Sequence, residues 1–377
     1  MNSVYINKVS KFLPNRPVSN ATMEQYLGKI NDKESKAKNI VLRNNGIETR
    51  YYALDEQGNP THTNAEITAE AIKQLCDDSL KLEDIELISC GTSSPDYLMP
   101  SHAVMVHGEL KNGITEVNTA AGNCCAGMNA LKYGYFSVMT GNTKNAVCTG
   151  SERMSSWMLA NHFDQEVKHL ESLQEKPIIG FQKDFLRWML SDGAGAVLLE
   201  STPKGAYPLK IEWIESYSYA HEIETCMYAG AEKKTDGSLT SFSDINSNEW
   251  LNKSIFSVKQ DTRLLDKYIA AKGVESVQIA FKKHQLTPED ITYLLPHVSS
   301  HYFIKGLFNA LKEANFEFAE ERWYTNLKKV GNVGAGSVFL MLEELVASNT
   351  LKKGDKILLC VPESARFSYA YALLTVQ

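Results

Sequence analysis

The chain has 377 residues, of which 43% are hydrophobic and 22% charged, with 39 Lys and Arg residues against 45 Asp and Glu residues. This composition is typical of a compact globular protein and excludes disordered, collagen-like and coiled-coil classes. The formal charge of −6 argues against a protein that coats nucleic acid, because neutralising phosphates needs a basic excess. At about 100–200 residues per domain, the length predicts about two units.

Expected helices and strands alternate along the chain, which predicts an α/β fold. In chain order, the expected strands lie at residues 86–90, 146–149, 194–199, 209–215, 293–295, 356–361 and 369–375. The expected helices lie at residues 67–77, 127–138, 261–271, 302–314 and 338–348. No low-complexity segment or Pro/Gly/Ser-rich linker divides the sequence.

The seven cysteines follow no CxxC pattern, and their odd number leaves at least one unpaired. Such usage is typical of a reducing compartment, so we expect free thiols. The N-terminal segment lacks the apolar stretch of a signal peptide, and no window reaches about 18 consecutive apolar residues. We therefore expect a cytoplasmic protein without membrane insertion.

An internal repeat indicates how the chain is divided. Residues 83–94 read EDIELISCGTSS and residues 289–300 read EDITYLLPHVSS, while GNCCAG at residues 122–127 recurs as GNVGAG at residues 331–336. The strand with Cys148 then recurs as one with Cys360, in the same order. Coincidence of common short strings is the alternative explanation. We expect two similar α/β halves, residues 1–204 and 205–377, packed as a pseudo-twofold pair.

The two expected halves differ in chemistry at equivalent positions. Cys125 stands where the second half has Gly334, and His297 stands where the first half has Gly91. Because equivalent loops meet near a twofold axis, we expect Cys125, His297 and Asn332 to converge. Cys with His and Asn is a nucleophile constellation. The alternatives are a buried structural thiol, a surface or satisfied histidine and a plain turn asparagine.

Small residues around Cys125 predict a loop that enters an apolar helix, which places this thiol at a helix N-terminus. There the helix dipole and free N–H groups favour the thiolate and can bind an oxyanion. Cys124 is expected to point about 100° away around the helix, into packing. His301, four residues after His297, is expected to cap or pack.

At these residues the chain resembles the thiolase-fold condensing enzymes, specifically the β-ketoacyl-acyl-carrier-protein synthase III group. Three segments are similar to segments of that group: residues 46–50 to its GIxxR segment, residues 88–101 to the strand and loop before its nucleophile, and residues 191–200 to its GDGAGA stretch. Three residues match its active-site residues. Cys125 in CCAGM matches the nucleophile, His297 matches the active-site histidine, and Asn332 in VGNVGAGS matches the asparagine.

The resemblance implies a thiolase-like α/β fold of five layers, αβαβα. It also implies that Cys125 takes an acyl group from a thioester. His297 with Asn332 would then stabilise the enolate or carbanion that attacks this acyl group.

Two motifs depart from the group's pattern. VSS follows His297 where the group has QAN, and its glycine-rich GGGF turn, which helps shape the oxyanion hole, is replaced by residues 364–367. We expect Ser364, Arg366 and Phe367 to contact substrate or to narrow the site. These departures argue against the ordinary acetyl-priming reaction of fatty-acid synthesis.

Two stretches, about residues 153–190 and 216–262, are long insertions relative to a minimal thiolase fold. The first is rich in aromatic and methionine side chains: Met154, Trp157, Met158, Phe163, Phe181, Phe185, Trp188 and Met189. It is interpreted either as a helix pair at a dimer interface or as a lid over an acyl tunnel, which needs apolar walls. Trp157 is the expected substrate contact.

The N-terminal segments SKFLPNRPVSN and YYALDEQGNPTHTN resemble ketosynthase III-like enzymes that make dialkylresorcinol or aryl-polyene-type pigments. Those enzymes join two β-ketoacyl units instead of extending with malonyl. We therefore expect a Claisen-type condensation through a Cys-bound acyl intermediate. A β-keto substrate has an acidic α-carbon and would need less help from the protein.

The expected partners are acyl thioesters of an acyl carrier protein or of coenzyme A, and a second copy of the chain in a homodimer. A carrier protein is acidic, so an acidic enzyme must present basic residues locally. Lys305 and Lys312 share one face of the expected helix 302–314 and are the candidates at the tunnel mouth, ahead of Arg43 and Lys328; solvated surface lysines are the alternative. No cofactor and no metal are expected, because no Cys/His spacing indicates a metal site.

Other functions remain open at this stage. One alternative is fatty-acid initiation with a malonyl carrier protein, and another is a catalytically silent partner subunit of a ketosynthase complex. A papain-like hydrolase also orders Cys, His and Asn along the chain, but the CGSCW-type signature is missing and the repeated halves do not suit it. SDGAGA is a weak match to a dinucleotide-binding loop, since it lacks the GxGxxG pattern and opens a strand.

Overall fold

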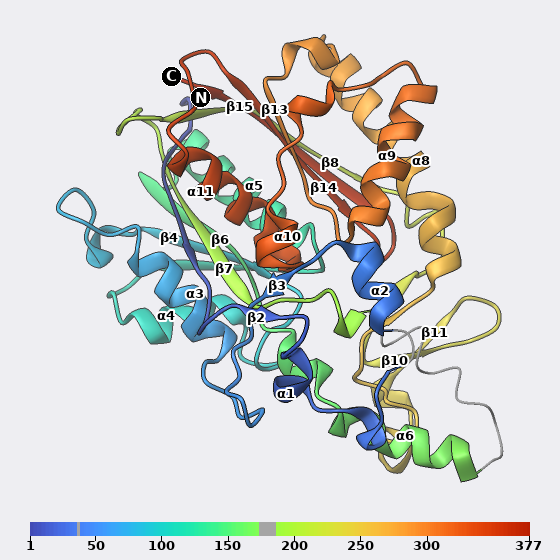
Figure 1. Ribbon diagram of the computed structural model, residues 1–377. Coiled ribbons are helices and arrows are strands. Elements are labelled where there is room, and N and C mark those ends of the chain that lie inside the picture. Colours follow the sequence, from blue (N-terminus) through green and yellow to red (C-terminus); the bar gives the residue numbers. More distant parts are fainter. Residues whose placement is uncertain (36–37, 173–185) are drawn as a thin grey trace.

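The computed structural model describes residues 1–35, 38–172 and 186–377. Its centre is a nine-stranded sheet in the order β13-β14-β15-β8-β1-β7-β6-β4-β5 (Figure 1). These strands are β1 (Tyr5–Phe12), β4 (Leu87–Thr92), β5 (Glu116–Ala121), β6 (Asn145–Glu152), β7 (Gly193–Glu200), β8 (Leu209–Ser218), β13 (Tyr293–Pro296), β14 (Lys356–Glu363) and β15 (Ser368–Val376).

Helices cover the sheet, and short strands sit at its margins. The helices are α1 (Met23–Leu27), α2 (Lys38–Asn45), α3 (Asn64–Lys73), α4 (His102–Leu110), α5 (Ala126–Thr140), α6 (Asn161–Ser172), α8 (Thr262–His284), α9 (His301–Glu313), α10 (Leu327–Val330) and α11 (Ser337–Ala347). The short strands are β2 (Val18–Ser19), β3 (Thr49–Arg50), β9 (Met227–Tyr228), β10 (Ala231–Lys233), β11 (Leu239–Ser241) and β12 (Lys259–Gln260). The α/β class is confirmed.

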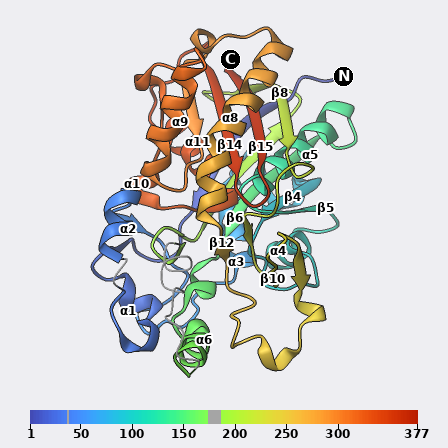
Figure 2. The same ribbon diagram turned by 90° about the vertical axis from the view of Figure 1, so that its right-hand side faces the viewer.

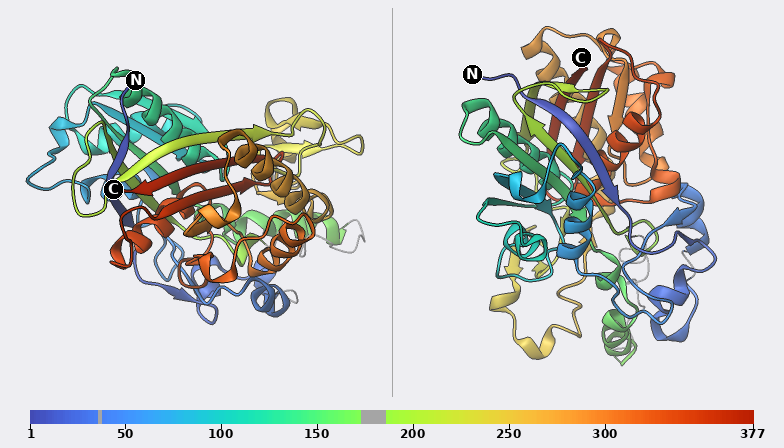
Figure 3. Two further views of the ribbon diagram at one scale, coloured as in Figure 1. Left: turned by 90° about the horizontal axis from the view of Figure 1, so that it is seen from above. Right: turned by 90° about the vertical axis from the view of Figure 1, so that its left-hand side faces the viewer.

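The strand pairing follows one scheme twice. β4 is parallel to β6, and β7 is antiparallel to both β6 and β1; β13 is likewise parallel to β14, and β15 is antiparallel to both β14 and β8. β1 and β8 pair at Tyr5 with Lys210 and at Ile6 with Leu209, which joins the two sets of strands into one sheet (Figure 3). The exact division at residues 204 and 205 stays a prediction.

Alternating side chains sort the core into layers, because successive strand residues point to opposite faces. On β7, Val197 and Leu199 pack with α5 and α11, whereas Ala196 and Leu198 pack with α3 and α4. On β15, Ala370 also packs with α5 and α11, whereas the neighbouring tyrosines pack with α8 and α9. The helices α5 and α11 are therefore sandwiched between the two sets of strands, with α3 and α4 outside one set and α8 and α9 outside the other, as a five-layered αβαβα arrangement requires.

The two expected insertions lie together at the end of the molecule opposite the chain termini (Figure 2). The described part of the first contains α6, and the second contains the pairs β10-β11 and β9-β12. Phe181 and Phe185 lie outside the described residues. In the described part of the chain, no helix has the length and apolar character needed to cross a membrane.

Candidate active site

Two cavities meet beside the start of α5. The larger, of about 580 Å³, lies under α9 and contains His297, and the smaller, of about 250 Å³, lies under the two insertions and contains Asn332. Both are lined by Cys124, Ser299 and Ser364. The predicted histidine and asparagine therefore open into two spaces that share the wall formed by Cys124.

Cys125 caps α5 but lines neither cavity. It is 4% exposed, belongs to the central hydrophobic cluster, and its Sγ lies 3.3 Å from the carbonyl oxygen of Val361, to which it donates. Burial, the Glu363 carboxylate and neighbouring thiols raise the pKa of Cys125 well above its usual range. The expected stabilisation of a thiolate by the helix N-terminus is thus outweighed by desolvation and by a nearby negative charge.

Cys124 packs against the central hydrophobic cluster, as expected, and it also lines the site, which was expected of the nucleophile. It is half-buried and lines both cavities, although burial, followed by the charges of Glu363 and Glu152, also raises its pKa well above the usual value. All seven cysteines are free thiols, as predicted. The structure therefore offers two adjacent thiols, of which the first along the chain is the accessible one.

His297 follows the end of β13 and faces the larger cavity. Its backbone N–H donates to the carbonyl oxygen of Cys360 at 2.8 Å, which fixes the residue against β14, and its Nδ1 has no hydrogen-bond partner. Burial lowers the pKa of His297 to about 4, so the ring is neutral at physiological pH. A neutral imidazole can donate to an enolate oxygen or accept a proton.

Asn332 lies 5% exposed in the glycine-rich turn before α11. Its Oδ1 accepts the N–H of Gly334 at 2.9 Å, and its backbone N–H and carbonyl pair with Met189 and Ser191, so the turn is bound to the segment just before β7. Gly334 has a φ of +47°, and a Cβ there would lie 2.7 Å from Oε1 of Glu152. A glycine is needed because the carboxylate fills the space beside the turn.

Glu152 links the two walls of the smaller cavity. Its carboxylate accepts the N–H of Ala335 at 3.1 Å, the N–H of Ser93 at 3.2 Å and the hydroxyl of Ser94 at 2.6 Å. Complete burial nevertheless raises the pKa of Glu152 to about 7. This side chain holds the Asn332 turn against the loop that follows β4.

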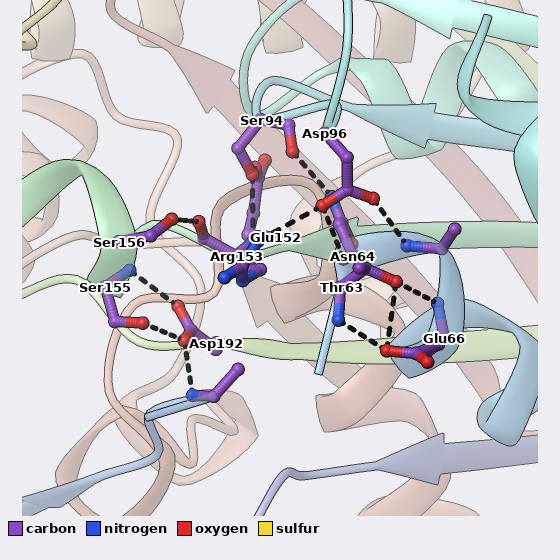
Figure 4. Close-up of polar contacts among 12 residues, drawn as sticks. Thr63, Asn64, Glu66, Ser94, Asp96, Glu152, Arg153, Ser155, Ser156 and Asp192 are labelled. Carbon is purple, nitrogen blue, oxygen red and sulfur yellow. Dashed lines mark hydrogen bonds and ion pairs between the residues drawn. The ribbon is translucent and has the colours of Figure 1, made fainter. Parts of the chain in front are cut away.

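A second layer of polar contacts supports that loop (Figure 4). The N–H of Arg153 donates to the Ser94 hydroxyl at 2.8 Å, and its guanidinium lies 3.3 Å from Asp96. Asp96 in turn accepts the N–H groups of Asn64 and Ala65 at the start of α3. The loop therefore has a fixed position between β4 and α3.

Glu363, at the end of β14, occupies the N-terminus of α5. One of its carboxylate oxygens accepts the N–H of Cys125 at 3.0 Å and that of Asn123 at 3.2 Å. Burial raises the pKa of Glu363 above its usual value. The N–H groups expected to hold an oxyanion are thus bound by an internal carboxylate.

The predicted substrate residues divide into two groups. Ser364 lines both cavities and Trp157 lines the smaller one. Arg366 is exposed and its guanidinium donates to the carbonyl oxygen of Ile223, while Phe367 is fully buried against Tyr268. Neither Arg366 nor Phe367 lines these two cavities, because the first is bound to the Ile223 carbonyl and the second is packed in the core.

The predicted carrier residues also differ in position. Lys305 is exposed and lines the mouth of the larger cavity with Arg43 and His301. Lys312 is exposed farther along α9 and lines neither cavity, and Lys328 forms an ion pair with Glu48 at 2.9 Å. Within the described residues, no group of three or more His, Cys, Asp or Glu side chains is placed to hold a metal ion.

The sequence reasoning missed Glu152 and Glu363. Glu152 ends an apolar strand in the string TGSE, and a carboxylate at such a buried position is a usable signal. Glu363 directly precedes the altered GGGF turn, yet its partners lie more than two hundred residues away. Local spacing therefore gave no indication of its role.

Comparison with known proteins shows which enzymes this chain resembles. Residues 281–374 match the family described as 3-Oxoacyl-[acyl-carrier-protein (ACP)] synthase III C terminal. The Beta-ketoacyl-[acyl-carrier-protein] synthase III of Clostridium novyi is 26% identical over 362 residues, 95% of each chain, and that of Chlorobaculum tepidum is 24% identical over 359 residues, 94% of each chain.

Solved structures of similar shape carry the same fold. The tetronic acid condensing enzyme AbyA1 has a TM-score of 0.77 at 22% identity, with 99% of each chain covered. OleA of Xanthomonas campestris, solved with lauric acid and lauroyl-CoA bound, has a TM-score of 0.74 at 18% identity, with 100% of this chain and 99% of that chain covered.

These findings confirm the thiolase-like fold predicted from the sequence. Over almost its whole length the chain is similar to the synthase III group of condensing enzymes, which are of the acyltransferase type.

Proposed function

We propose that the protein catalyses a Claisen-type carbon–carbon condensation of two acyl thioesters through an acyl group held on the Cys124–Cys125 pair. The meeting of the His297 cavity and the Asn332 cavity at Cys124 is the observation that carries this proposal. Cys125 is the nucleophile that the CAGM motif favours, and Cys124 is the thiol that the cavities favour. Both sit at the start of α5, so the chemistry is the same for either.

The first half-reaction transfers an acyl group to the thiol. The thiol loses its proton to a base, for which neutral His297 is the proposed acceptor, and the thiolate attacks the thioester carbonyl carbon. The carrier thiolate then leaves and takes a proton. The N–H of Cys125 is the proposed donor to the oxyanion, which requires Glu363 to move away or to become protonated.

The second half-reaction forms the carbon–carbon bond. A second thioester loses CO₂, or loses an α-proton to neutral His297, and the resulting enolate attacks the acyl carbon. The enzyme thiolate leaves and takes a proton from the imidazolium or from solvent. His297 and Asn332 are proposed to donate to the enolate oxygen. If the donor is a β-ketoacyl thioester, its acidic α-carbon places a small demand on these groups.

The finer proposal is that two β-ketoacyl units are joined, as in dialkylresorcinol or related pigment formation. The altered GGGF turn and the cavity walls contributed by both insertions support it, since neither is a feature of the group's ordinary pattern. Fatty-acid initiation with a malonyl thioester is the second candidate, and the curated relatives named as synthase III favour it.

Carrier and assembly complete the proposal. Lys305, with Arg43 at the same mouth, is proposed to receive an acidic carrier protein or the phosphates of coenzyme A, and Lys312 extends this basic face along α9. A homodimer is proposed through β5, which ends the sheet between α4 and α5; Leu98, Met99, Tyr133 and Phe136 are exposed apolar side chains around it. A cytoplasmic location agrees with the free thiols.

Intact-protein mass spectrometry tests this function. The enzyme is exposed to acetyl, malonyl, decanoyl and 3-oxodecanoyl thioesters, the loaded residue is mapped, and products are analysed after a second thioester is added. Cys124→Ala, Cys125→Ala and the double variant are compared with Cys76→Ala, a thiol far from the cavities. We expect the double variant to lose both loading and product, and unchanged product yield would indicate a silent partner subunit.

A further inference from the structure

The larger cavity has an apolar arm between α8 and α9. Its walls are two stripes of residues spaced four apart, each on one helix face, above a floor of sheet residues. The α8 stripe is Leu265, Ile269, Gly273 and Val277, the α9 stripe is Phe303, Leu307 and Leu311, and the floor is Leu294, Leu358, Tyr369 and Tyr371. The arm is therefore a slot that follows the direction of α8.

Polar atoms in the arm are already paired, except at one end. The hydroxyl of Tyr369 donates to the carbonyl oxygen of Ile269 at 2.8 Å, and that of Tyr371 contacts Ser276 at 2.7 Å, so both rings present only their apolar surfaces. Among the described lining residues, the buried side-chain atoms without a partner are Nδ1 of His297 and Nε2 of His301. The cavity thus suits a molecule with a polar head at His297 and an apolar tail.

We propose that this arm holds the straight hydrocarbon chain of one acyl substrate, with its thioester carbonyl beside Cys124 and His297. The inference rests on the proposed condensing function and adds the substrate class: an unbranched medium- or long-chain acyl group. The smaller cavity, with Glu152, Gln260 and Asn332 in its walls, is more polar and holds the other substrate.

Gly273 sets the width of the arm at its middle. A Cβ at this position would lie 3.4 Å from Cε1 of Tyr369 and 3.9 Å from Cδ1 of Leu307, so a methyl group fits but a longer side chain must enter the slot. A glycine inside a helix costs about 1 kcal/mol relative to alanine. Because a side chain here would fill the slot, a glycine is retained in the middle of α8, which runs from Thr262 to His284.

The test uses free alkanoates, which cannot react, and measures binding to the full-length enzyme by calorimetry. Hexanoate, octanoate, decanoate and dodecanoate are titrated into wild type, Gly273→Leu and Ala270→Leu, both changes lying in the lining. Ala271→Leu adds the same side chain one position farther, on an exposed part of α8, and Ala229→Phe narrows the smaller cavity instead. Thermal melting checks that each variant is folded.

In wild type, affinity should rise by about fourfold for each added methylene that enters the arm. Gly273→Leu and Ala270→Leu should flatten this dependence and weaken decanoate binding by roughly tenfold or more, while Ala271→Leu and Ala229→Phe leave it unchanged. Equal chain-length dependence in wild type and Gly273→Leu, or its loss in Ala229→Phe, would overturn the proposal. If the enzyme binds alkanoates as expected but catalyses no condensation, only the proposed function is refuted.

Discussion

Replacing Glu363 with glutamine removes a negative charge from the start of α5 and keeps an acceptor for the backbone N–H groups. In the wild type, the carboxylate accepts the N–H of Cys125 at 3.0 Å and contributes to the raised pKa of both Cys124 and Cys125. A carboxylate and a thiolate are like charges, so the carboxylate holds the thiols protonated. In Glu363→Gln, both thiol pKa values should therefore fall.

The size of the effect follows from the distance. At an effective dielectric constant of about 20, two unit charges about 4 Å apart interact with about 4 kcal/mol, which is an upper bound for this pair. Glu363 is partly exposed, so solvent screening leaves only a part of this energy. We therefore expect about tenfold more thiolate at a given pH below the thiol pKa, which corresponds to about 1.4 kcal/mol.

The assay is the rate of alkylation by iodoacetamide at pH 8, with each cysteine followed by peptide mass spectrometry. Glu363→Gln should be alkylated about tenfold faster than wild type at Cys124, and acyl loading should accelerate in parallel. Glu313→Gln, a change on the exposed face of α9, serves as the charge-matched control. A rate that is unchanged or slower in Glu363→Gln would show that the carboxylate is not holding the thiols protonated.

Three further outcomes follow from the same contacts. Gly334→Ala should destabilise the enzyme by about 1–3 kcal/mol, because its Cβ meets the Glu152 carboxylate, while Gly306→Ala, with open space around it, should be neutral or stabilising; matched melting temperatures would contradict this. Condensation by preloaded enzyme should show no acid limb near pH 6.5, because His297 stays neutral down to about pH 4. The pKa of Glu152 is raised to about 7, so its protonated form stabilises the folded state fully below pH 4.5, and this stabilisation is lost as the pH rises through 7. In wild type, the free energy of unfolding measured with denaturant should therefore fall by about 3 kcal/mol across this pH window, and in Glu152→Gln it should stay flat.

Strongly apolar strands and amphipathic helices could be predicted from the sequence, whereas β1 and β5 could not. β5 reads EVNTAA, with no large apolar side chain except Val117, because it lies at the edge of the sheet. β1 carries Lys8 and Lys11, whose amino groups reach Asp77 and Glu343 while the strand backbone pairs with β7. Long side chains can extend their charges out of a central strand, which hides the strand from pattern analysis.

α8 extends well beyond the predicted residues 261–271, as far as His284. Gly273 and the basic run at the end of the helix weaken the sequence signal. That run lies in the last turn, where cations interact favourably with the helix dipole. The glycine is the residue that leaves the slot beneath α8 open, so the same position that obscured the helix gives the cavity its shape.

The roles of Cys124 and Cys125 mark the limit of local reasoning about this site. Spacing correctly places the pair at the start of α5, where neighbouring residues point in different directions. Contacts from the other half of the chain decide which of the two side chains faces the cavities. The thiol of Cys125 donates a hydrogen bond to the carbonyl oxygen of Val361, and its backbone N–H donates to the carboxylate of Glu363. If the Glu363 side chain moves away from α5, the N–H of Cys125 becomes free to bind an oxyanion. The negative charge that disfavours a thiolate is then removed as well. Under the proposed mechanism, the choice of the thiol that takes the acyl group therefore depends on Glu363 as well as on the two cysteines.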